Sequence, residues 1–241
     1  MPERLAPGDA AGAETLAIMA AAPNYNNWMY EVIAPYIGRR ILEVGSGIGN
    51  LSAQMLEAGA EHLVLTDMDE WYRARLRERF GGNPSVRVDS LMLPDPTAAE
   101  RFAADRLDTV VALNVVEHIE DDIGALRTMR NMLVPGGRLV ILVPAMPAIY
   151  GEMDRELGHF RRYGKASLDE AFRTAGFRVD RMLWWNRVGV AGWWFNGRVR
   201  KVARIPIDQL KRFDGLVPML KLERFLPLPF GQSLIAVGTP I

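Results

Sequence analysis

The sequence of 241 residues contains no cysteine. Disulfide bonds, thiolate metal sites and cysteine nucleophiles are therefore excluded. It also has no excess of charge of either sign, because 29 Lys and Arg balance 29 Asp and Glu. A general nucleic-acid binder would usually show a basic excess. The balance argues against that class and leaves only a local basic patch open.

Long apolar runs are also absent. No stretch of about 18 or more uninterrupted apolar residues occurs, so we expect no membrane span. The N-terminal segment MPERLAPGDAAGAETL lacks a basic region followed by an apolar core, so we expect no signal peptide. Without either signal, the default expectation is a cytoplasmic protein. No internal repeat is present.

The length suits one domain with elaborations. We expect a flexible tail over residues 1–14 and a single domain over residues 15–241. Residues 15–37 should be helical, with a break near Pro23. Helical patterns follow over residues 51–60, 70–80, 121–133 and 167–177, the last with Ser167 as N-cap. Short apolar runs typical of buried strands cover residues 40–44, 62–67, 85–90, 107–114, 138–144, 177–185 and 233–239.

This alternation of strands and helices predicts an α/β fold with a mostly parallel sheet and helices on both faces. Ligands of such sheets bind beyond the carboxyl ends of the strands. Four residues should lie at those ends, namely Gly45, Asp67, Asp89 and Asn114.

Residues 41–50, ILEVGSGIGN, place three glycines after the first strand. Gly45, Gly47 and Gly49 are spaced G-x-G-x-G, whereas the dinucleotide fingerprint has its third glycine one position later, where Asn50 stands. A nicotinamide oxidoreductase is therefore disfavoured. The loop suits a ligand without a pyrophosphate that needs close approach of the backbone.

Five blocks carry a resemblance to a known family. They are EVGSGIG after the first strand, LTDMD after the second, VDS after the third, and then VVALNVVEHIED and LVPGGRLVILVP. Residues 24–184 resemble a class I S-adenosylmethionine-dependent methyltransferase of the small-molecule type, similar to methyltransferase types 11 and 12. The resemblance implies a Rossmann-like, seven-stranded, mostly parallel sheet with a C-terminal antiparallel strand. Helical lid insertions would lie at about 145–166 and 186–230.

The resemblance also implies S-adenosylmethionine as cofactor and S-adenosylhomocysteine as product. Asp67 would accept from the two ribose hydroxyls, Met68 would pack on the adenine, and Asp89 would accept from the adenine amino group. Glu43 would order the loop or meet the ammonium group of the cofactor. Asp67 could instead cap the helix that starts near Glu70. The full set of expected cofactor-binding residues is Glu43, Gly45, Ser46, Gly47, Gly49, Asp67, Met68, Asp89, Ser90, Leu91, Asn114, Tyr25 and Trp28.

Several of these residues have plainer alternatives. Ser90 or Leu91 would supply a backbone amide to the adenine, but Asp89 could equally be a turn residue. Tyr25 and Trp28 resemble a segment that closes over the methionine tail, and ordinary packing is the alternative for both.

The stretch NVVEHIEDD, residues 114–122, follows the fourth strand and offers candidate bases. Glu117 and His118 share one helical face with Asn114 if this stretch is helical, and the unperturbed pKa of histidine suits a general base. A related ubiquinone-pathway group holds a divalent metal here, but its first acidic position is Asn114 in this chain, so we expect no metal. Alternatively, Glu117 and Glu120 begin the next helix, and His118 packs beneath the cofactor.

Residues 150–168, YGEMDRELGHFRRYGKASL, form a basic cluster between a strand and a helix. Such a cluster suits an anionic group of the acceptor, which arginine would bind bidentately. His159 is a further candidate base. Alternatively, the arginines of a solvated loop pair with Glu152, Asp154, Glu156 and Asp169. The expected substrate-binding residues are Arg155, His159, Arg161, Arg162 and Tyr163, together with Trp185 and Trp193 from the next insertion.

That insertion, residues 186–230, combines tryptophans with an amphipathic pattern. Leu210, Phe213, Val217, Leu220 and Phe225 predict one apolar helix face, broken near Pro218. The insertion could be a lid over an apolar acceptor, a membrane-surface helix, or a helix that covers the sheet edge or a homodimer interface.

Together these features predict methyl transfer to a small-molecule acceptor with an anionic group and an apolar body. Whether oxygen, nitrogen or carbon is methylated stays open. Methylation of a lipid-linked acceptor at a membrane surface is one alternative, and a non-catalytic S-adenosylmethionine-binding protein is another. A nucleic-acid partner is not expected, because the chain lacks a basic excess, an appended recognition domain and an Asn-Pro-Pro-Tyr-type motif after the fourth strand.

Overall fold

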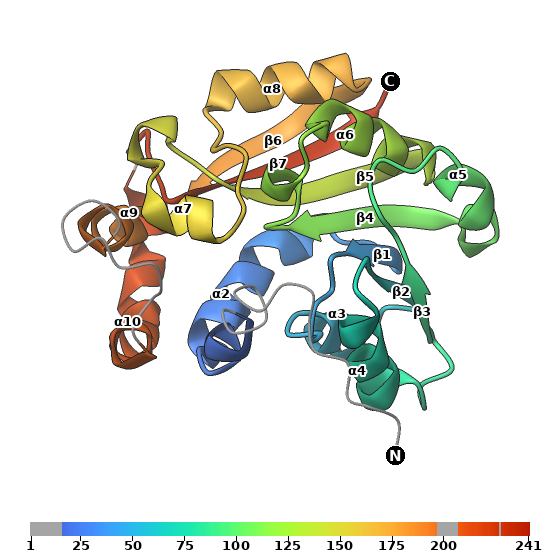
Figure 1. The fold of residues 1–241 in the computed structure, drawn as a ribbon, viewed down its shortest axis with the longest axis horizontal. Helices are drawn as coiled ribbons and strands as arrows, with labels where there is room; N and C mark the ends of the chain where they lie inside the picture. Colours follow the sequence, from blue (N-terminus) through green and yellow to red (C-terminus); the bar gives the residue numbers. More distant parts are fainter. Residues whose placement is uncertain (1–15, 197–206, 227) are drawn as a thin grey trace.

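Seven strands form one sheet at the centre of the computed structural model, which describes residues 16–196, 207–226 and 228–241 (Figure 1). The strand order is β3-β2-β1-β4-β5-β7-β6. β7 runs antiparallel to β5 and β6, and the other neighbouring strands pair in parallel, so the predicted mostly parallel sheet with a C-terminal antiparallel strand is confirmed. The strands are β1 (Arg40–Val44), β2 (His62–Asp67), β3 (Val86–Ser90), β4 (Leu107–Leu113), β5 (Leu133–Pro144), β6 (Phe177–Trp185) and β7 (Ser233–Pro240).

Helices cover both faces of this sheet, as predicted (Figure 1). One core packs α5 (Ala98–Arg101), α6 (Asp122–Asn131) and α8 (Lys165–Thr174) against the sheet. The opposite core contains residues of α2 (Pro23–Ile33), α3 (Ser52–Glu57), α4 (Glu70–Phe80) and α10 (Ile207–Leu220). Short 3-10 turns complete the chain: η1 (Ala34–Tyr36), η2 (Ala103–Asp105), η3 (Val116–His118), η4 (Pro147–Ile149) and η6 (Lys221–Phe225).

The two expected insertions lie together at the carboxyl ends of the parallel strands. In Figure 1, α7 (Glu152–Glu156), α9 (Arg187–Trp194) and α10 stand beside α2 at the end toward which β4 points. The expected break near Pro23 is also present, because a turn at residues 21–22 precedes the start of α2. The expected tail over residues 1–14 lies outside the described residues.

Several boundaries differ from the prediction, and two of these differences change the role expected of a residue or a segment. Ser167 does not cap α8, which begins at Lys165 after Gly164. Its hydroxyl instead accepts the backbone N–H of Gly164 at 3.0 Å. Helix α6 ends at Asn131, and Leu133 already pairs with Leu107 in the sheet. The following proline and glycines therefore lie inside β5 rather than closing the helix.

The predicted break of α10 near Pro218 is wrong, because the helix continues to Leu220. Proline has no N–H for the carbonyl four residues earlier, which here belongs to Asp214. The side-chain amide of Asn24 on α2 donates to that carbonyl at 3.3 Å. The lost helical hydrogen bond is thus replaced from another element. On the predicted apolar face, Phe225 is 68% exposed, contrary to expectation.

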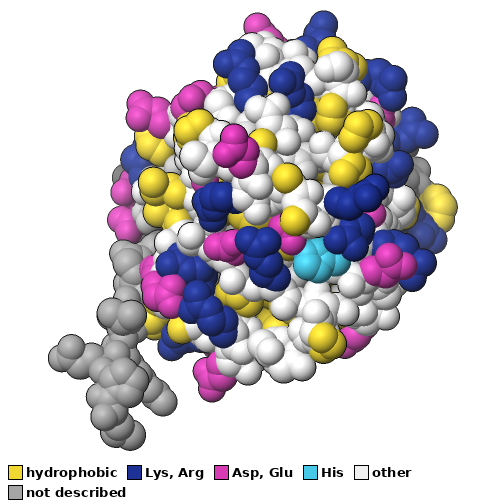
Figure 2. Space-filling view, turned by 90° about the vertical axis from the view of Figure 1, so that its right-hand side faces the viewer, with side chains coloured by type: hydrophobic (Ala, Val, Ile, Leu, Met, Phe, Trp, Pro, Cys, Tyr) yellow, Lys and Arg dark blue, Asp and Glu magenta, His cyan; other side chains and the backbone are white. Residues whose placement is uncertain are grey.

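Figure 2 shows the surface at the side of β3 and α5, where basic and acidic side chains are interspersed and hydrophobic areas are small. This face carries no region of one charge sign, in keeping with the balanced composition. Among the described residues, no helix is both long and apolar enough to span a membrane.

Candidate functional site

A cavity of about 1390 Å³ opens at the carboxyl ends of β1, β2 and β4. This is the edge at which parallel sheets bind ligands. The predicted residues that line it are Tyr25, Glu43, Gly45, Ser46, Gly47, Asp67, Met68, Leu91, Asn114, Glu117, His118, His159, Arg162 and Trp193. Residues from seven separate stretches of the sequence thus meet in one space.

The glycine loop after β1 forms the floor of the cavity. Gly45 and Gly47 have φ angles of +65° and +54°, which side chains disfavour. A Cβ atom on Gly45 would lie 2.7 Å from a methyl group of Val115. The loop is tied to β2, because the N–H of Ser46 donates to the carbonyl of Thr66 at 2.9 Å. Gly49, the third glycine, does not line the cavity and packs against Phe80.

Two carboxyl groups lie beneath and beside this loop. Glu43 is buried and receives a hydrogen bond from the Ser52 hydroxyl. Burial raises the pKa of Glu43 to about 7. Asp67 accepts the N–H of Gly47 at 3.1 Å, and burial raises its pKa as well. Both carboxyl groups therefore hold the loop and still border the cavity.

The cap of α4 is Asp69 rather than Asp67. One carboxylate oxygen of Asp69 accepts the N–H of Trp71 at 2.8 Å. The capping alternative for Asp67 is therefore wrong, and its side chain faces the cavity and the glycine loop.

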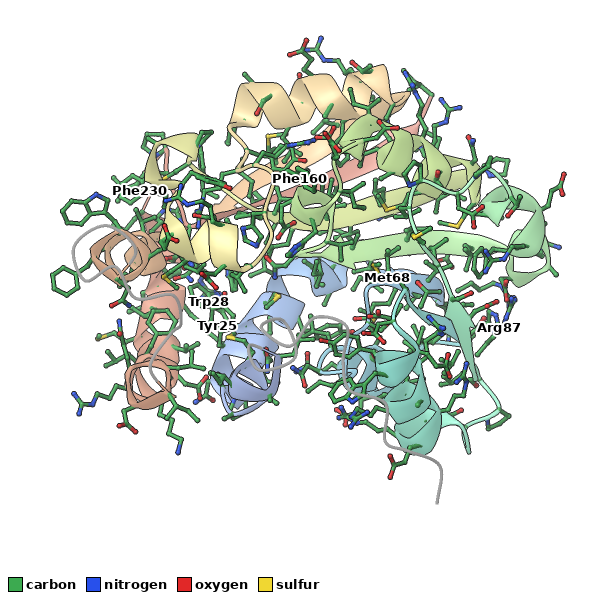
Figure 3. The ribbon with its side chains drawn as sticks, in the orientation of Figure 1. Tyr25, Trp28, Met68, Arg87, Phe160 and Phe230 are labelled. Carbon is green, nitrogen blue, oxygen red and sulfur yellow. The ribbon has the colours of Figure 1, made fainter. Side chains whose placement is uncertain are left out.

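Met68 follows on the cavity wall and is 69% exposed, which excludes a place in the core. Figure 3 labels it at the end of β2. Arg73, which the sequence did not single out, donates to the carbonyls of Asp67 and Met68 at 2.8 and 2.7 Å. It fixes the backbone of this wall. Only its position one turn into α4 could have indicated that role.

The end of β3 departs from expectation. Asp89 does not line the cavity, because its carboxylate pairs with the guanidinium groups of Arg87 and Arg101. The N–H of Ser90 donates to Asp89, and the N–H of Leu91 donates to the carbonyl of Asp67. Neither amide is free for an adenine ring, although Leu91 still lines the cavity.

Tyr25 and Trp28 differ in position. Tyr25 lines the cavity, whereas Trp28 is buried and lies 4.9 Å from the Trp185 ring, centroid to centroid. Tyr25 also contacts Trp185 and, on α10, Phe213. Figure 3 labels both residues between α2 and α10. Trp28 and Trp185 thus support the wall from behind, and Trp185 is not a lining residue.

Glu117 is the most unusual group of the site. Its side chain is 0% exposed, and neither carboxylate oxygen has a hydrogen-bond partner. Burial raises its pKa to about 8. His118 and His159 lie beside it, with their ring centroids 4.7 Å apart. The three predicted catalytic residues are therefore brought together, although 41 positions separate His118 from His159.

Asp154 organises the far side of this cluster. It is fully buried and accepts from His159 Nδ1 at 3.0 Å and from Arg162 Nε at 2.7 Å. Burial alone would raise the pKa of Asp154, but these two partners hold it below its usual value. Arg162 Nη1 donates to the carbonyl of Ala145, while Nη2 is buried without a partner. One guanidinium nitrogen is left for a ligand.

Glu117, His118 and His159 can also present one ligand atom each within 4.8 Å of one another. A carboxylate with two imidazoles is a donor set that can hold a divalent cation. The expectation of no metal rests on Asn114, whereas the third donor of this set, His159, is brought in by the fold from a distant part of the sequence.

The rest of the basic cluster is dispersed, contrary to the expectation of one anion site. Arg155 is exposed and pairs with Glu152, and Arg161 pairs with Asp122. The Tyr163 hydroxyl donates to Asp122 at 2.7 Å. None of the three lines the cavity. The solvated-loop alternative thus holds for Arg155 and Arg161, with a different acidic partner for Arg161.

A smaller cavity of about 110 Å³ lies beneath α9 and α10. Leu210, Phe213 and Gly192 line it, none of which borders the main cavity. Five residues line both spaces: Met19, Tyr25, Met153, Trp193 and Gln232. The insertion therefore roofs an extension of the main cavity with largely apolar walls, as the lid alternative requires.

The chain is similar to known methyltransferases. A family model described as a methyltransferase domain matches residues 11–181. A probable S-adenosylmethionine-dependent methyltransferase of Mycolicibacterium smegmatis is 31% identical over 149 residues, which are 61% of this chain and 54% of that protein. A tRNA U34 carboxymethyltransferase of Psychrobacter arcticus is 27% identical over 127 residues, or 48% of this chain and 36% of that protein. The chain thus spans about half or less of the curated relatives it matches.

The fold itself is also found among solved structures. A chain described as a methyltransferase, solved in a complex with the Haloferax volcanii Trm112 methyltransferase activator, superposes with a TM-score of 0.67. It is 15% identical, and the match covers 98% of this chain and 99% of that one. At this identity the likeness shows the fold alone.

The site fits S-adenosylmethionine, the cofactor of this family. The Cβ-free backbone at Gly45 and Gly47 leaves room for its amino-acid tail. The Asp67 carboxylate can accept from the two ribose hydroxyls, and exposed Met68 offers an apolar surface to the adenine.

Proposed function

The chain belongs to the methyltransferase family with a class I, S-adenosylmethionine-binding fold, and we propose that it methylates a small amphiphilic molecule. The observation that carries this proposal is Glu117, a buried acid without a partner that faces the same cavity as the glycine loop and Asp67. A structural role would normally give a buried carboxyl group hydrogen bonds. An orphaned one suits a group whose partner is the substrate.

The cofactor supplies an activated methyl group on a sulfonium centre. The chain then has to hold the acceptor in line and exclude water. When the acceptor carries an O–H or N–H, Glu117 in its carboxylate form takes that proton as the new bond to the methyl group forms. Burial keeps the pKa of Glu117 at about 8, which suits a base that works near neutral pH.

Two neighbours would position the acceptor. His159 is oriented by its hydrogen bond to Asp154, and Arg162 presents its unpartnered Nη2. An anionic or carbonyl oxygen of the acceptor would accept from that nitrogen. The proposed anion site therefore consists of Arg162 alone rather than of the whole basic cluster.

The apolar body of the acceptor would enter the extension beneath α9 and α10. Leu210 and Phe213 provide apolar walls there, and Trp193 stands at the junction of the two cavities. Burial of an apolar group in such a space is favourable by about 25 cal/mol for each Å² removed from water. A small amphiphile uses both parts of the cavity.

The first experiment incubates the protein with methyl-labelled S-adenosylmethionine and a cell extract, then separates organic-extractable molecules, water-soluble small molecules, RNA and protein. Label in the organic fraction supports the proposal, provided that Asp67→Ala and Glu117→Gln abolish it. Label in RNA or protein overturns the proposed substrate class. RNA is measured separately because one relative is named a tRNA U34 carboxymethyltransferase.

A second readout separates binding from catalysis. Glu117→Gln should retain affinity for S-adenosylhomocysteine within about threefold while losing transfer by about a hundredfold or more. Glu156→Gln, the same change at an exposed position, is the matched control. If Glu117→Gln loses cofactor affinity and methyl transfer to the same extent, Glu117 is not the base of the reaction.

A further inference from the structure

The outer side of the C-terminal insertion carries large hydrophobic side chains that contact solvent. On α10, Leu216 is 50% exposed and Met219 is 60% exposed, and Leu222 and Phe225 continue the surface on η6. Arg212, Leu216 and Met219 follow the i, i+4, i+7 spacing that places residues on one helix face. An apolar stripe flanked by a cation therefore runs along the outside of α10.

Among the described residues, it is the opposite face of α10 that packs against the rest of the chain. Leu210, Val217 and Leu220 are buried on that inner face. Asp214 lies among them and accepts backbone N–H groups of α2. The helix is thus fixed in orientation, with the stripe turned outward.

Charge in this insertion is strongly one-sided. Residues 186–230 contain nine Lys and Arg but only three Asp and Glu, although the whole chain is balanced. Two of these acids, Asp214 and Glu223, are buried and bind N–H groups at the starts of α2 and α9. The exposed charges of α10 and η6 are mainly those of Lys211, Arg212 and Arg224, with Asp208 as the exposed acid.

We propose that the outer face of α10 and η6 docks on an anionic lipid bilayer. Apolar side chains at the level of the headgroups, flanked by cations, are the pattern of helices that lie in a membrane interface. A second copy of the chain suits this face less well. A two-fold contact would bring Lys211, Arg212 and Arg224 against the same positive surface, with Asp208 as the one exposed acid of α10 and η6 to pair with them.

The proposal also explains how α10 is used on both sides. Leu210 and Phe213, on its inner side, line the smaller cavity, while Leu216 and Met219 point outward. Docking would place this helix between the bilayer and the cavity extension. The docking surface does not depend on which molecule is methylated. Failure of the docking proposal would therefore not contradict the proposed methylation, and the reverse also holds.

The test is sedimentation of the full chain with vesicles of phosphatidylcholine alone and of phosphatidylcholine mixed with phosphatidylglycerol. We expect binding to the anionic vesicles only, and release at high salt. The double variant Leu216→Gln with Met219→Gln should weaken binding by about tenfold or more, and Arg212→Glu by on the order of tenfold. Circular dichroism melts verify that each variant is folded.

Matched controls are Ile241→Gln, an exposed apolar residue elsewhere, and Arg173→Glu, an exposed arginine on α8. Both should bind like the unmodified protein. No binding to either vesicle overturns the proposal, as does equal binding to both vesicle types or equal loss in the controls. A dimer in solution that the Leu216 and Met219 variant dissociates would also overturn it, by showing that a second copy covers this face.

Discussion

The carboxylate of Asp214 accepts the backbone N–H of Tyr25 at 2.8 Å, although 189 positions separate the two residues. Asp214 also accepts from the N–H and the side-chain amide of Asn24. These groups belong to the first turn of α2, whose own N-cap residue, Ala22, has no side-chain acceptor. The C-terminal insertion therefore caps a helix that lines the cofactor cavity.

Asp214→Ala should loosen α2 and the cavity wall that it carries. Two backbone N–H groups would lose their acceptor, which costs about 1–3 kcal/mol of the free energy of unfolding. Because Tyr25 lines the cavity, affinity for S-adenosylhomocysteine should fall several-fold, measured by calorimetry. Asp208→Ala removes an exposed carboxylate from the same helix and should change neither quantity. Equal effects of the two changes would contradict the capping role.

The sequence predicted the local elements well. The bounds of β2, α4 and β6 match the structure residue for residue, because period and turn signals are local. The short helices α7 and α9 were not predicted as such. They have five and eight residues, too few for periodicity to mark, and their contacts with distant elements hold them in place.

For the candidate site, the sequence predicted which strand ends meet, but it did not predict which polar side chains pair with one another there. Glu117 and His118 were predicted as candidate bases. Their proximity to His159 and Asp154 depends on the fold of residues 144–163. Likewise, nothing local distinguishes Arg162, which is buried beside Asp154, from Arg161, which pairs with Asp122. Such pairings follow from tertiary distances.

Gly45→Ala should impair the glycine loop through one specific contact. The new Cβ would meet Val115 at 2.7 Å, and valine is a short, stiff side chain that cannot easily move aside. We expect at least a tenfold loss of affinity for S-adenosylhomocysteine and about 1–2 kcal/mol of lost stability. Gly59→Ala is the matched control, because Gly59 also has a positive φ but no atom within 4 Å of the new Cβ. It should lose stability only.

Asp67→Ala should weaken every ligand that carries the ribose. Loss of two hydrogen bonds to a charged acceptor corresponds to about 3 kcal/mol or more, or roughly a hundredfold in dissociation constant. Calorimetry with S-adenosylhomocysteine and with adenosine checks this, since both contain the ribose. Asp169→Ala, a half-buried acid on α8 that does not line the cavity, should bind both ligands normally. A loss confined to S-adenosylhomocysteine would place Asp67 at the amino-acid tail instead.

Glu117→Gln should make the protein more stable at alkaline pH, even though we expect it to lose methyl transfer. Burial raises the pKa of Glu117 from an ordinary 4.5 to about 8, so the folded state prefers the neutral carboxyl group. The stability gained from that preference is complete below about pH 4.5 and is lost as the pH rises through 8, where the buried group must ionise. The cost at pH 9 is on the order of 5 kcal/mol.

Glutamine in that position carries no charge at any pH. The difference in free energy of unfolding between Glu117→Gln and the unmodified protein should therefore grow in favour of the variant from pH 5 to pH 9. Urea denaturation at several pH values measures it, and Glu156→Gln should show no such trend, because Glu156 is exposed. If this free-energy difference stays constant from pH 5 to pH 9, the Glu117 carboxylate is paired with a cation in solution. Glu117 would then no longer be proposed as the base of the reaction.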